Sequence, residues 1–347
     1  MLEKNETEIM KRWAYSEPPL LTVAVISYNH ENYIAEALDG ILMQETDFPF
    51  EVIVNDDCST DNTVKILEAY AKKYPTIIKL ILQKENQYSK GVKMETLLFE
   101  KAAGKYVAIC EGDDYWIDPH KLQIQLDEMR KVENCQMSFH SAIDIWEDKS
   151  KKDEITTKQA KGNRLFSASD VVRGGGGFCP TASLIFEKEA VENLPEWFDK
   201  TPFSDYFLQI FGSLKGGALY IDRPMSVYRR NAAGSWSISE MLAIGTREKQ
   251  SEKMIAALND MDRYFEKKFH SEIKKMESDW CLDMAFAYLY NNDVDKFNQA
   301  ICQSYRLSDK KSKKLLLSFY LRRFPVLLRG IGKLNKRLNK YLARNFF

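Results

Sequence analysis

Four short apolar runs, separated by segments with helical periodicity, occupy much of residues 20–110. The runs are rich in β-branched residues and apolar on both faces, a pattern typical of strands buried in a parallel sheet. They cover residues 20–27, 50–55, 77–82 and 106–110. Apolar residues between the runs recur at helical spacing. This alternation predicts an α/β fold with a mostly parallel central sheet flanked by helices.

Two acidic clusters directly follow strands of this expected sheet. Residues 56–61 follow the second apolar run, and residues 111–114 follow the fourth. Ligands of open α/β sheets bind beyond the carboxyl ends of the strands. We therefore expect both clusters on one rim of the sheet, at a ligand site.

The second cluster, Glu111-Gly112-Asp113-Asp114, has three carboxylates in four residues. Carboxylates this close repel one another unless a positive charge lies between them. Oxygen ligands suit a hard cation such as Mg²⁺ or Mn²⁺, which in turn suits a phosphate. The alternative is a solvated acidic turn after a strand, and the motif alone does not decide between the two.

The rest of the chain predicts further strands, helices and two loops. Strands are expected at 137–146, 178–186, 218–221 and 225–228, helices at 119–129, 166–172, 205–212 and 239–305, an exposed loop at 147–163 and a polar loop at 229–237. Four glycines at 174–177 match neither a dinucleotide fingerprint nor a P-loop, which leaves a flexible active-site loop or an ordinary hinge. Asp205 is either a functional carboxylate or, like Ser204, a helix cap.

Residues 306–347 are strongly basic and interleaved with apolar side chains. They hold 13 Lys or Arg and one acid, although the whole chain has zero net charge. The pattern predicts a basic amphipathic segment lying on an anionic membrane surface. The alternative is a helix packed on the protein with a solvated basic face. Nucleic acid is not an expected partner, because no nucleic-acid-binding module surrounds the tail.

Composition and cysteine usage point to a reduced globular protein. Hydrophobic residues make up 44% of the 347 positions, which is enough for a full core. The six cysteines contain no C-x-x-C pair, which argues against a disulfide framework or a zinc site. The acidic N-terminus does not resemble a signal peptide, and no apolar run reaches membrane-spanning length. We expect a cytoplasmic protein, peripheral at the inner face of the membrane.

Three motifs together resemble the family 2 glycosyltransferases of the inverting GT-A fold, of capsular and surface polysaccharide type. They are Val-Ala-Val-Ile-Ser-Tyr-Asn at 23–29, Asn-Asp-Asp-Cys-Ser-Thr-Asp-Asn-Thr at 55–63 and Glu-Gly-Asp-Asp-Tyr-Trp-x-Asp-Pro-x-Lys-Leu at 111–122. The resemblance covers about residues 20–237 and depends on the order and spacing of all three. It implies inverting, metal-dependent transfer of a sugar from a nucleotide-sugar donor of UDP type to a glycan or lipid-linked acceptor.

The resemblance also implies roles for single residues. The implied donor-binding residues are Ser27, Tyr28, Asn29, Asp56, Asp57, Lys93, Asp113, Arg229 and Arg230. Asp113 is the implied ligand of Mn²⁺ or Mg²⁺, with Asp114 and Glu111 as further candidates; Glu111 stands where the family usually has aspartate. Asp205 matches the general base, which takes a proton from the acceptor hydroxyl. Asn231 replaces a histidine of many members, so no metal role is expected there.

The expected organisation has four parts. Residues 1–19 form a lead-in, 20–237 the GT-A domain, 238–305 a helical extension and 306–347 the basic amphipathic tail. The Gln-x-x-Arg-Trp motif of processive synthases is absent, which favours transfer of one sugar per encounter. Two other functions remain open: a nucleotidyltransferase and a non-catalytic relative that binds sugar nucleotides.

Overall fold

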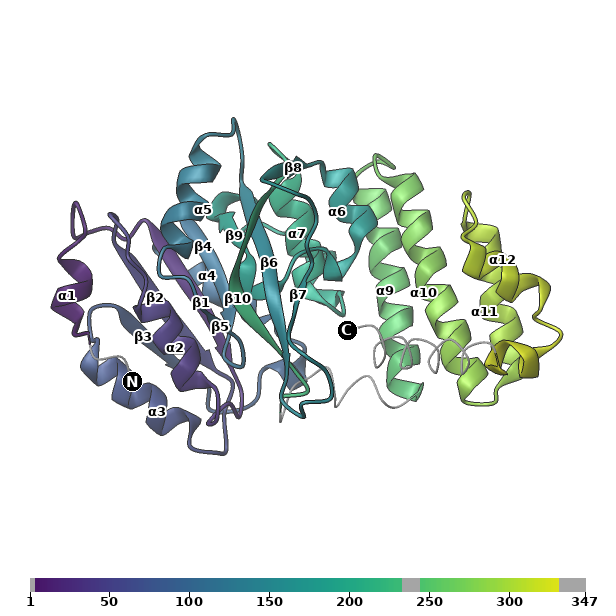
Figure 1. Cartoon of the computed structure of the whole chain (residues 1–347), viewed down its shortest axis with the longest axis horizontal. Coiled ribbons are helices and arrows are strands. Elements are labelled where there is room, and N and C mark those ends of the chain that lie inside the picture. Colours follow the sequence, from purple (N-terminus) through teal and green to yellow (C-terminus); the bar gives the residue numbers. More distant parts are fainter. Residues whose placement is uncertain (1–3, 233–243, 331–347) are drawn as a thin grey trace. The chain divides into compact units, whose positions relative to one another are not determined.

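A computed structural model describes residues 4–232 and 244–330 of the chain. It divides into two compact units, Met1–Ser239 and Glu240–Phe347. The first unit contains all the strands of the described residues, and the second is helical in its described part (Figure 1).

A ten-stranded mixed sheet forms the centre of the first unit. Its main path has the order β3-β2-β1-β4-β9-β6-β10-β5, with β7 added on β6 and β8 on β10. The strands are β1 (Leu21–Ser27), β2 (Phe50–Asp56), β3 (Ile78–Leu82), β4 (Tyr106–Glu111), β5 (Tyr115–Trp116), β6 (Met137–Trp146), β7 (Glu154–Thr156), β8 (Arg164–Phe166), β9 (Ile185–Glu187) and β10 (Ala218–Arg230).

The long ladders of the sheet are parallel, as the apolar runs predict. β3, β2, β1 and β4 pair in parallel, and so do β6 and β10. β9 lies antiparallel between β4 and β6 and joins the two halves. Because two antiparallel steps restore the direction, β4, β6 and β10 all end at the same rim. The α/β fold is confirmed.

Helices cover the sheet and complete its core. They are α1 (Glu6–Met10), α2 (Ile34–Leu42), α3 (Thr63–Lys73), α4 (Met94–Lys101), α5 (Lys121–Arg130), α6 (Ala168–Gly174) and α7 (Ser204–Ser213). Apolar side chains at helical spacing on α2, among them Leu38 and Ile41, share one buried cluster with Val23 and Val25 of β1. α4 packs on β1 and β2, and α7 packs on β6 and β10.

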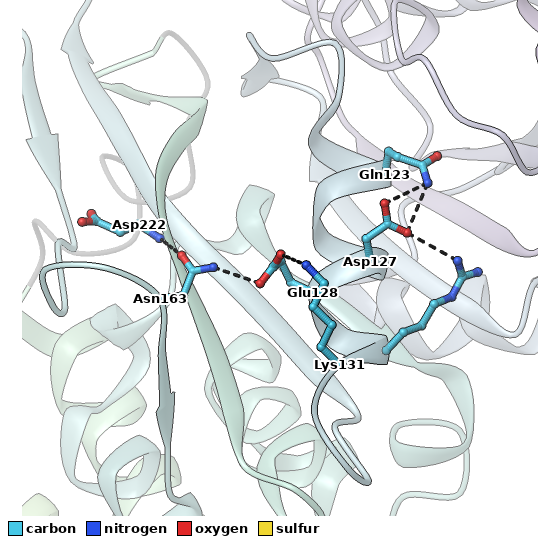
Figure 2. A network of polar contacts seen from close by, with 7 residues as sticks. Gln123, Asp127, Glu128, Lys131, Asn163 and Asp222 are labelled. Atoms are coloured by element: carbon cyan, nitrogen blue, oxygen red, sulfur yellow. Dashed lines mark hydrogen bonds and ion pairs between the residues drawn. The ribbon is translucent and has the colours of Figure 1, made fainter.

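Polar contacts on the surface tie α5 to the loop before β8 and to β10 (Figure 2). The Asn163 amide donates to Glu128 at 3.1 Å, and its oxygen accepts the Asp222 backbone N–H at 3.1 Å. Lys131 holds the other oxygen of Glu128 at 2.5 Å. One asparagine thus fixes the end of the loop that precedes β8 against α5 and the middle of β10.

Several expected elements differ from the structure. Only residues 185 and 186 of the expected strand 178–186 lie in a strand, β9, because Pro180 lacks the N–H that a ladder needs and precedes a 3-10 turn. The strands expected at 218–221 and 225–228 are one strand, β10, with a ladder irregularity between them. The expected loop 147–163 contains β7, which pairs with β6.

The glycine run and the polar loop also need correction. Gly174 ends α6, and Gly175 has a φ of +72°, which leads into a short 3-10 turn. Arg229 and Arg230, expected in the loop 229–237, are the last two residues of β10 and pair with Ile145 and Trp146. Residues 233–237 of that loop lie outside the described residues.

The second unit is a set of antiparallel helices. They are α9 (Ile244–Tyr264), α10 (His270–Tyr290), α11 (Val294–Leu307) and α12 (Lys313–Tyr320). α10 packs against both α9 and α11, and Figure 1 shows the three side by side. Leu315 of α12 and Leu328 complete a small core with α10 and α11. The helical pattern expected for 239–305 is confirmed within the described range.

No helix in residues 4–232 and 244–330 combines the length and the apolar character needed to cross a bilayer.

Candidate active site

Three strands of the sheet end level with one another, and their last residues form the floor of the candidate site. Ser27 of β1 lies opposite Asp56 of β2, and Ile26 lies opposite Glu111 of β4. The next backbone N–H groups close the rim, because Asp57 and Gly112 donate to the carbonyls of Ser27 and Ile26, each at 2.9 Å. The expectation that both acidic clusters share one rim is confirmed.

The loops after β1 and β2 are locked together by side chains. Asp56 accepts both the N–H and the hydroxyl of Ser59, at 2.9 and 2.5 Å, and the Ser59 oxygen accepts the Asn29 N–H at 2.8 Å. The Asn29 side chain in turn accepts the Thr60 N–H at 2.8 Å. Asn29 and Cys58 both adopt positive φ, at +54° and +66°. This rigid double loop leaves Tyr28 exposed at the rim.

Asp57 fixes the loop that follows β3. Its two carboxylate oxygens accept the backbone N–H groups of Gln87 and Tyr88, at 2.7 and 3.0 Å. Asp57 is buried, and Tyr88 is exposed. The loops after β1, β2 and β3 therefore form one connected wall, in which Asp57 joins the loop after β2 to the loop after β3.

The acidic turn between β4 and β5 requires glycine in the middle. A Cβ on Gly112 would lie 2.7 Å from the His30 Nδ1 atom and 3.0 Å from an Ile34 methyl group. Burial lowers the pKa of His30, against the opposing effect of the Asp113, Asp61 and Asp56 charges. Because Gly112 admits the His30 loop so closely, the first and third motifs are in direct contact.

The carboxylates of the turn crowd one another. Burial raises the pKa of Glu111 well above its ordinary value, and Asp114, Asp113, Asp205 and Glu95 raise it further. Burial and the Asp113 charge likewise raise the pKa of Asp114, whereas the Arg229 N–H, which donates to it at 3.0 Å, lowers it. The second Asp114 oxygen is buried and has no hydrogen-bond partner among the described residues.

This electrostatic crowding fits a divalent cation. In the described part of the chain, no group of three or more Asp, Glu, His or Cys side chains is arranged to hold a metal ion. Mg²⁺, however, is commonly bound by one or two carboxylates plus substrate phosphates rather than by a cage of protein ligands. Asp113 and Glu111, at the partly exposed end of β4, could supply those carboxylates.

Asp205 reaches the same site from α7. It is the second residue of the helix, and one carboxylate oxygen accepts the Tyr206 N–H at 2.8 Å. Burial raises its pKa to about 6, with Glu95 raising it further and Lys93 lowering it. No side chain makes a capping hydrogen bond at the N-cap, Phe203. Neither Ser204 nor Asp205 is the N-cap residue, but Asp205 does accept one backbone N–H of the first turn of α7.

Arg229 and Arg230 are engaged with protein carboxylates. The Arg229 guanidinium bonds Glu36 and, at 2.8 Å, Glu147, and it lies over the rings of Tyr33 and Tyr115. Only 8% of the Arg229 side chain is exposed. Arg230 is paired with Asp144 at 2.7 Å. Arg229 thus holds the end of β10 against α2, at the back of the acidic turn.

Two residues near the acidic turn carried no recognisable sequence signal. Glu95 lies on α4, and its charge acts on both Asp205 and Glu111. Tyr228 lies near Glu111 and Asp114, whose charges add to the effect of burial in raising its pKa. Lys93 was expected to contact the donor, but its ammonium group donates a hydrogen bond to the Thr201 carbonyl. These placements depend on tertiary contacts, which the pattern of one segment does not reveal.

Comparison with known proteins fits this geometry. The family model described as Glycosyl transferase family 2 matches residues 22–195, about half of the chain. The chain belongs to glycosyl transferase family 2. The matched range includes both acidic clusters and Glu95, whereas Asp205 and the arginines at the end of β10 lie beyond it.

Among relatives in the family, an uncharacterized protein of Mycobacterium tuberculosis is 35% identical over 217 residues. That match covers 62% of this chain and 60% of the relative. Over 125 residues the chain is also 35% identical to the poly(ribitol-phosphate) beta-N-acetylglucosaminyltransferase TarS of Staphylococcus aureus, covering 32% of this chain and 21% of TarS. The chain thus matches about 60% of the length of the first relative and much less of the second.

Two solved structures of glycosyltransferases share the fold. TarS residues 1–349, in complex with UDP-GlcNAc, aligns with a TM-score of 0.61 over 93% of this chain and 91% of that one, at 17% identity. A mannosyltransferase of Pyrobaculum calidifontis, in complex with GDP-Man and Mn²⁺, aligns with a TM-score of 0.51 over 90% and 86%, at 16% identity. At these identities the likeness establishes the GT-A fold alone.

Proposed function

We propose that this protein is an inverting glycosyltransferase that transfers one sugar from a nucleotide-sugar donor to a hydroxyl of a glycan or lipid-linked acceptor. One observation carries the proposal: two acidic clusters and Asp205 converge at a single strand-end rim in a member of glycosyl transferase family 2. Membership in glycosyl transferase family 2 indicates sugar transfer as the class of reaction. The rim carries the carboxylates that such a reaction requires.

The donor would lie across the rim formed by β1, β2 and β4. The wall around Tyr28, Asn29, Asp56 and Asp57 is preformed by hydrogen bonds, which suits recognition of a rigid nucleoside. The UDP-GlcNAc bound by TarS supports a UDP-type donor. Because the Pyrobaculum calidifontis enzyme binds GDP-Man, GDP-sugars should be tested beside UDP-sugars. Ser27 is wholly buried, so its role would be to shape the floor.

Mn²⁺ or Mg²⁺ would sit between the donor diphosphate and the acidic turn. Asp113 is the proposed ligand, with Glu111 the second carboxylate; Asp114 is partly committed to the Arg229 N–H. The cation would neutralise the charge that develops on the departing diphosphate. The Mn²⁺ bound together with GDP-Man by the Pyrobaculum calidifontis mannosyltransferase supports the use of a divalent cation.

Asp205 would act as the general base. Its pKa of about 6 leaves it mostly ionised at neutral pH, yet basic enough to accept a proton. The acceptor oxygen would attack the anomeric carbon from the face opposite the diphosphate, and one displacement inverts the configuration. The acceptor would be a growing surface polysaccharide or its lipid-linked precursor.

A ligand panel tests the donor and the reaction. We expect UDP-sugars with Mn²⁺ to raise the melting temperature more than GDP-sugars do, and the preferred donor to be turned over with inversion, visible by NMR of the product anomer. Asp205→Asn should bind the donor normally and lose turnover. Donor binding without transfer or hydrolysis by the native protein would instead indicate a non-catalytic relative. Transfer of the nucleotidyl group with release of sugar 1-phosphate would indicate a nucleotidyltransferase.

The proposal includes a peripheral location on an anionic membrane surface, through residues 306–347. Residues 331–347 lie outside the described residues, but α12 and the turn after it carry exposed apolar and basic side chains. A lipid-linked acceptor would make this location useful.

A further inference from the structure

Two side chains at the start of α4 contact the segment that leads into Asp205, one just before α7 and one at the first residue of that helix. The Lys93 ammonium donates to the Thr201 carbonyl, and Glu95 accepts the Ser204 hydroxyl at 2.6 Å. The Thr201 hydroxyl is itself buried and donates to the Phe198 carbonyl at 2.7 Å. The backbone leading into Asp205 is therefore fixed by contacts from a helix 109 positions earlier in the sequence.

The same two residues have opposite charges and act on Asp205 in opposite directions. Glu95 raises the pKa of Asp205, and Lys93 lowers it. Asp205 also interacts with the Glu111 carboxyl on β4 and the buried Cys179 thiol, and it raises the pKa of both groups. α7 itself contains no other charged residue. The start of α4 therefore supplies both a cation and an anion that act on Asp205.

We propose that Lys93 and Glu95 are positioning residues for Asp205, holding the first turn of α7 in place and balancing the charge around its carboxylate. The inference rests on the proposed function, because it gives Asp205 the role of base. Lys93 then serves the base rather than the donor phosphates, and the two roles predict different effects of its substitution.

Separate variants isolate the charge from the hydrogen bond. Glu95→Gln keeps an oxygen acceptor for the Ser204 hydroxyl while removing the negative charge, and Ser204→Ala removes the hydrogen bond alone. Lys93→Met removes the positive charge and the bond to Thr201, and Lys93→Arg restores both. Glu100→Gln and Lys101→Met are matched controls, because both residues are exposed on the same helix.

The acid limb of the pH profile of kcat is the decisive measurement. We expect the limb to fall by about one pH unit in Glu95→Gln and to rise by about one unit in Lys93→Met, because a neighbouring charge shifts a carboxyl pKa by that order. Lys93→Arg should return the limb to its native position, and both controls should leave it unchanged. Ser204→Ala should lower kcat without moving the limb.

Two results would overturn the inference while leaving the proposed function intact. One is an acid limb that disappears in Asp205→Asn but does not move in Glu95→Gln or Lys93→Met. The other is a Lys93→Met variant whose donor Kd rises with the limb unchanged, since that result assigns Lys93 to the donor. Full turnover by Asp205→Asn would instead contradict the proposed base, and with it the inference.

Discussion

Asp113 and Asp114 are neighbours in the sequence with different surroundings. Asp114 is 2% exposed and accepts the backbone N–H of Arg229, so it links the acidic turn to the end of β10. Asp113 lies on the partly exposed side of the turn, where a metal and a diphosphate have access. Within this one cluster, Asp114 is therefore partly engaged by the protein backbone, whereas Asp113 remains the more accessible candidate metal ligand.

Substitution of the two aspartates should therefore have different effects. We expect Asp113→Asn to lower kcat by about 100-fold, because stabilising the leaving diphosphate by a metal ion is worth several kcal/mol. The same variant should lose the Mn²⁺-dependent rise in melting temperature but keep its stability without metal. Asp114→Asn should alter stability as well as turnover. Asp113→Asn with native turnover and native Mn²⁺ response would refute the metal assignment.

The proposed role of Asp205 as general base predicts a pH dependence of turnover. A base must be ionised to act, so kcat should rise with pH through the Asp205 pKa of about 6 and level off above it. Substituting Asn for Asp205 should remove this limb and lower kcat by a factor of about 100 to 10,000, the usual contribution of general base catalysis. Donor affinity should be unchanged when it is measured by calorimetry at about pH 7.5, close to the neutral pH at which a general base operates.

At the scale of elements, the end of β10 depends on one side chain. Arg229 joins three elements, because it bonds Glu36 of α2 and Glu147 after β6 and lies 4.6 Å from the ring centre of Tyr115 in β5. Its partners are partly exposed, so solvent screens the ion pairs, but the guanidinium itself is buried.

Arg229→Met should lower the free energy of unfolding by about 1–2 kcal/mol, since it removes hydrogen bonds to charged groups and a cation–aromatic contact. That change corresponds to a fall in melting temperature of a few degrees for a domain of this size. Arg130→Met, which breaks an exposed ion pair on α5, should change stability by less than about 0.5 kcal/mol. If Arg229→Met instead keeps native stability and weakens donor binding, the phosphate-contact interpretation of Arg229 is correct.

The sequence predicts the strands of one half of the sheet better than those of the other half. β1, β2 and β4 were predictable because strands buried on both faces are continuously apolar, and the polar residues that end them announce the rim. The segment around Pro180 is equally apolar, but most of it does not join the strand ladder, because Pro180 has no backbone N–H to donate. Glu95 could not be found, because its role depends on how α4 meets α7, a contact between distant segments.

At the scale of the molecule, the described part of the basic tail presents an unusual surface. Leu315 and Leu328 anchor it in the core of the second unit. Between and beside them, Leu317, Tyr320, Phe324, Val326 and Leu327 are 47–74% exposed. The same stretch of sequence also carries basic side chains at Lys310, Lys311, Lys313, Lys314, Arg322, Arg323 and Arg329. Exposed apolar side chains interspersed with cations match the boundary between acyl chains and anionic headgroups.

Vesicle binding tests whether this face docks on lipid. The full-length protein should cosediment with vesicles containing phosphatidylglycerol, bind neutral phosphatidylcholine vesicles weakly, and be released as salt screens the basic residues. A triple Tyr320→Ser, Phe324→Ser and Val326→Ser variant should bind more than about tenfold less tightly, because the buried apolar area supplies much of the binding energy. The matched control replaces Tyr15, Ile155 and Leu165 by Ser, since these side chains are similarly exposed outside the tail. Equal binding of the two triple variants would show that the exposed face of α12 and its following turn does not enter the membrane.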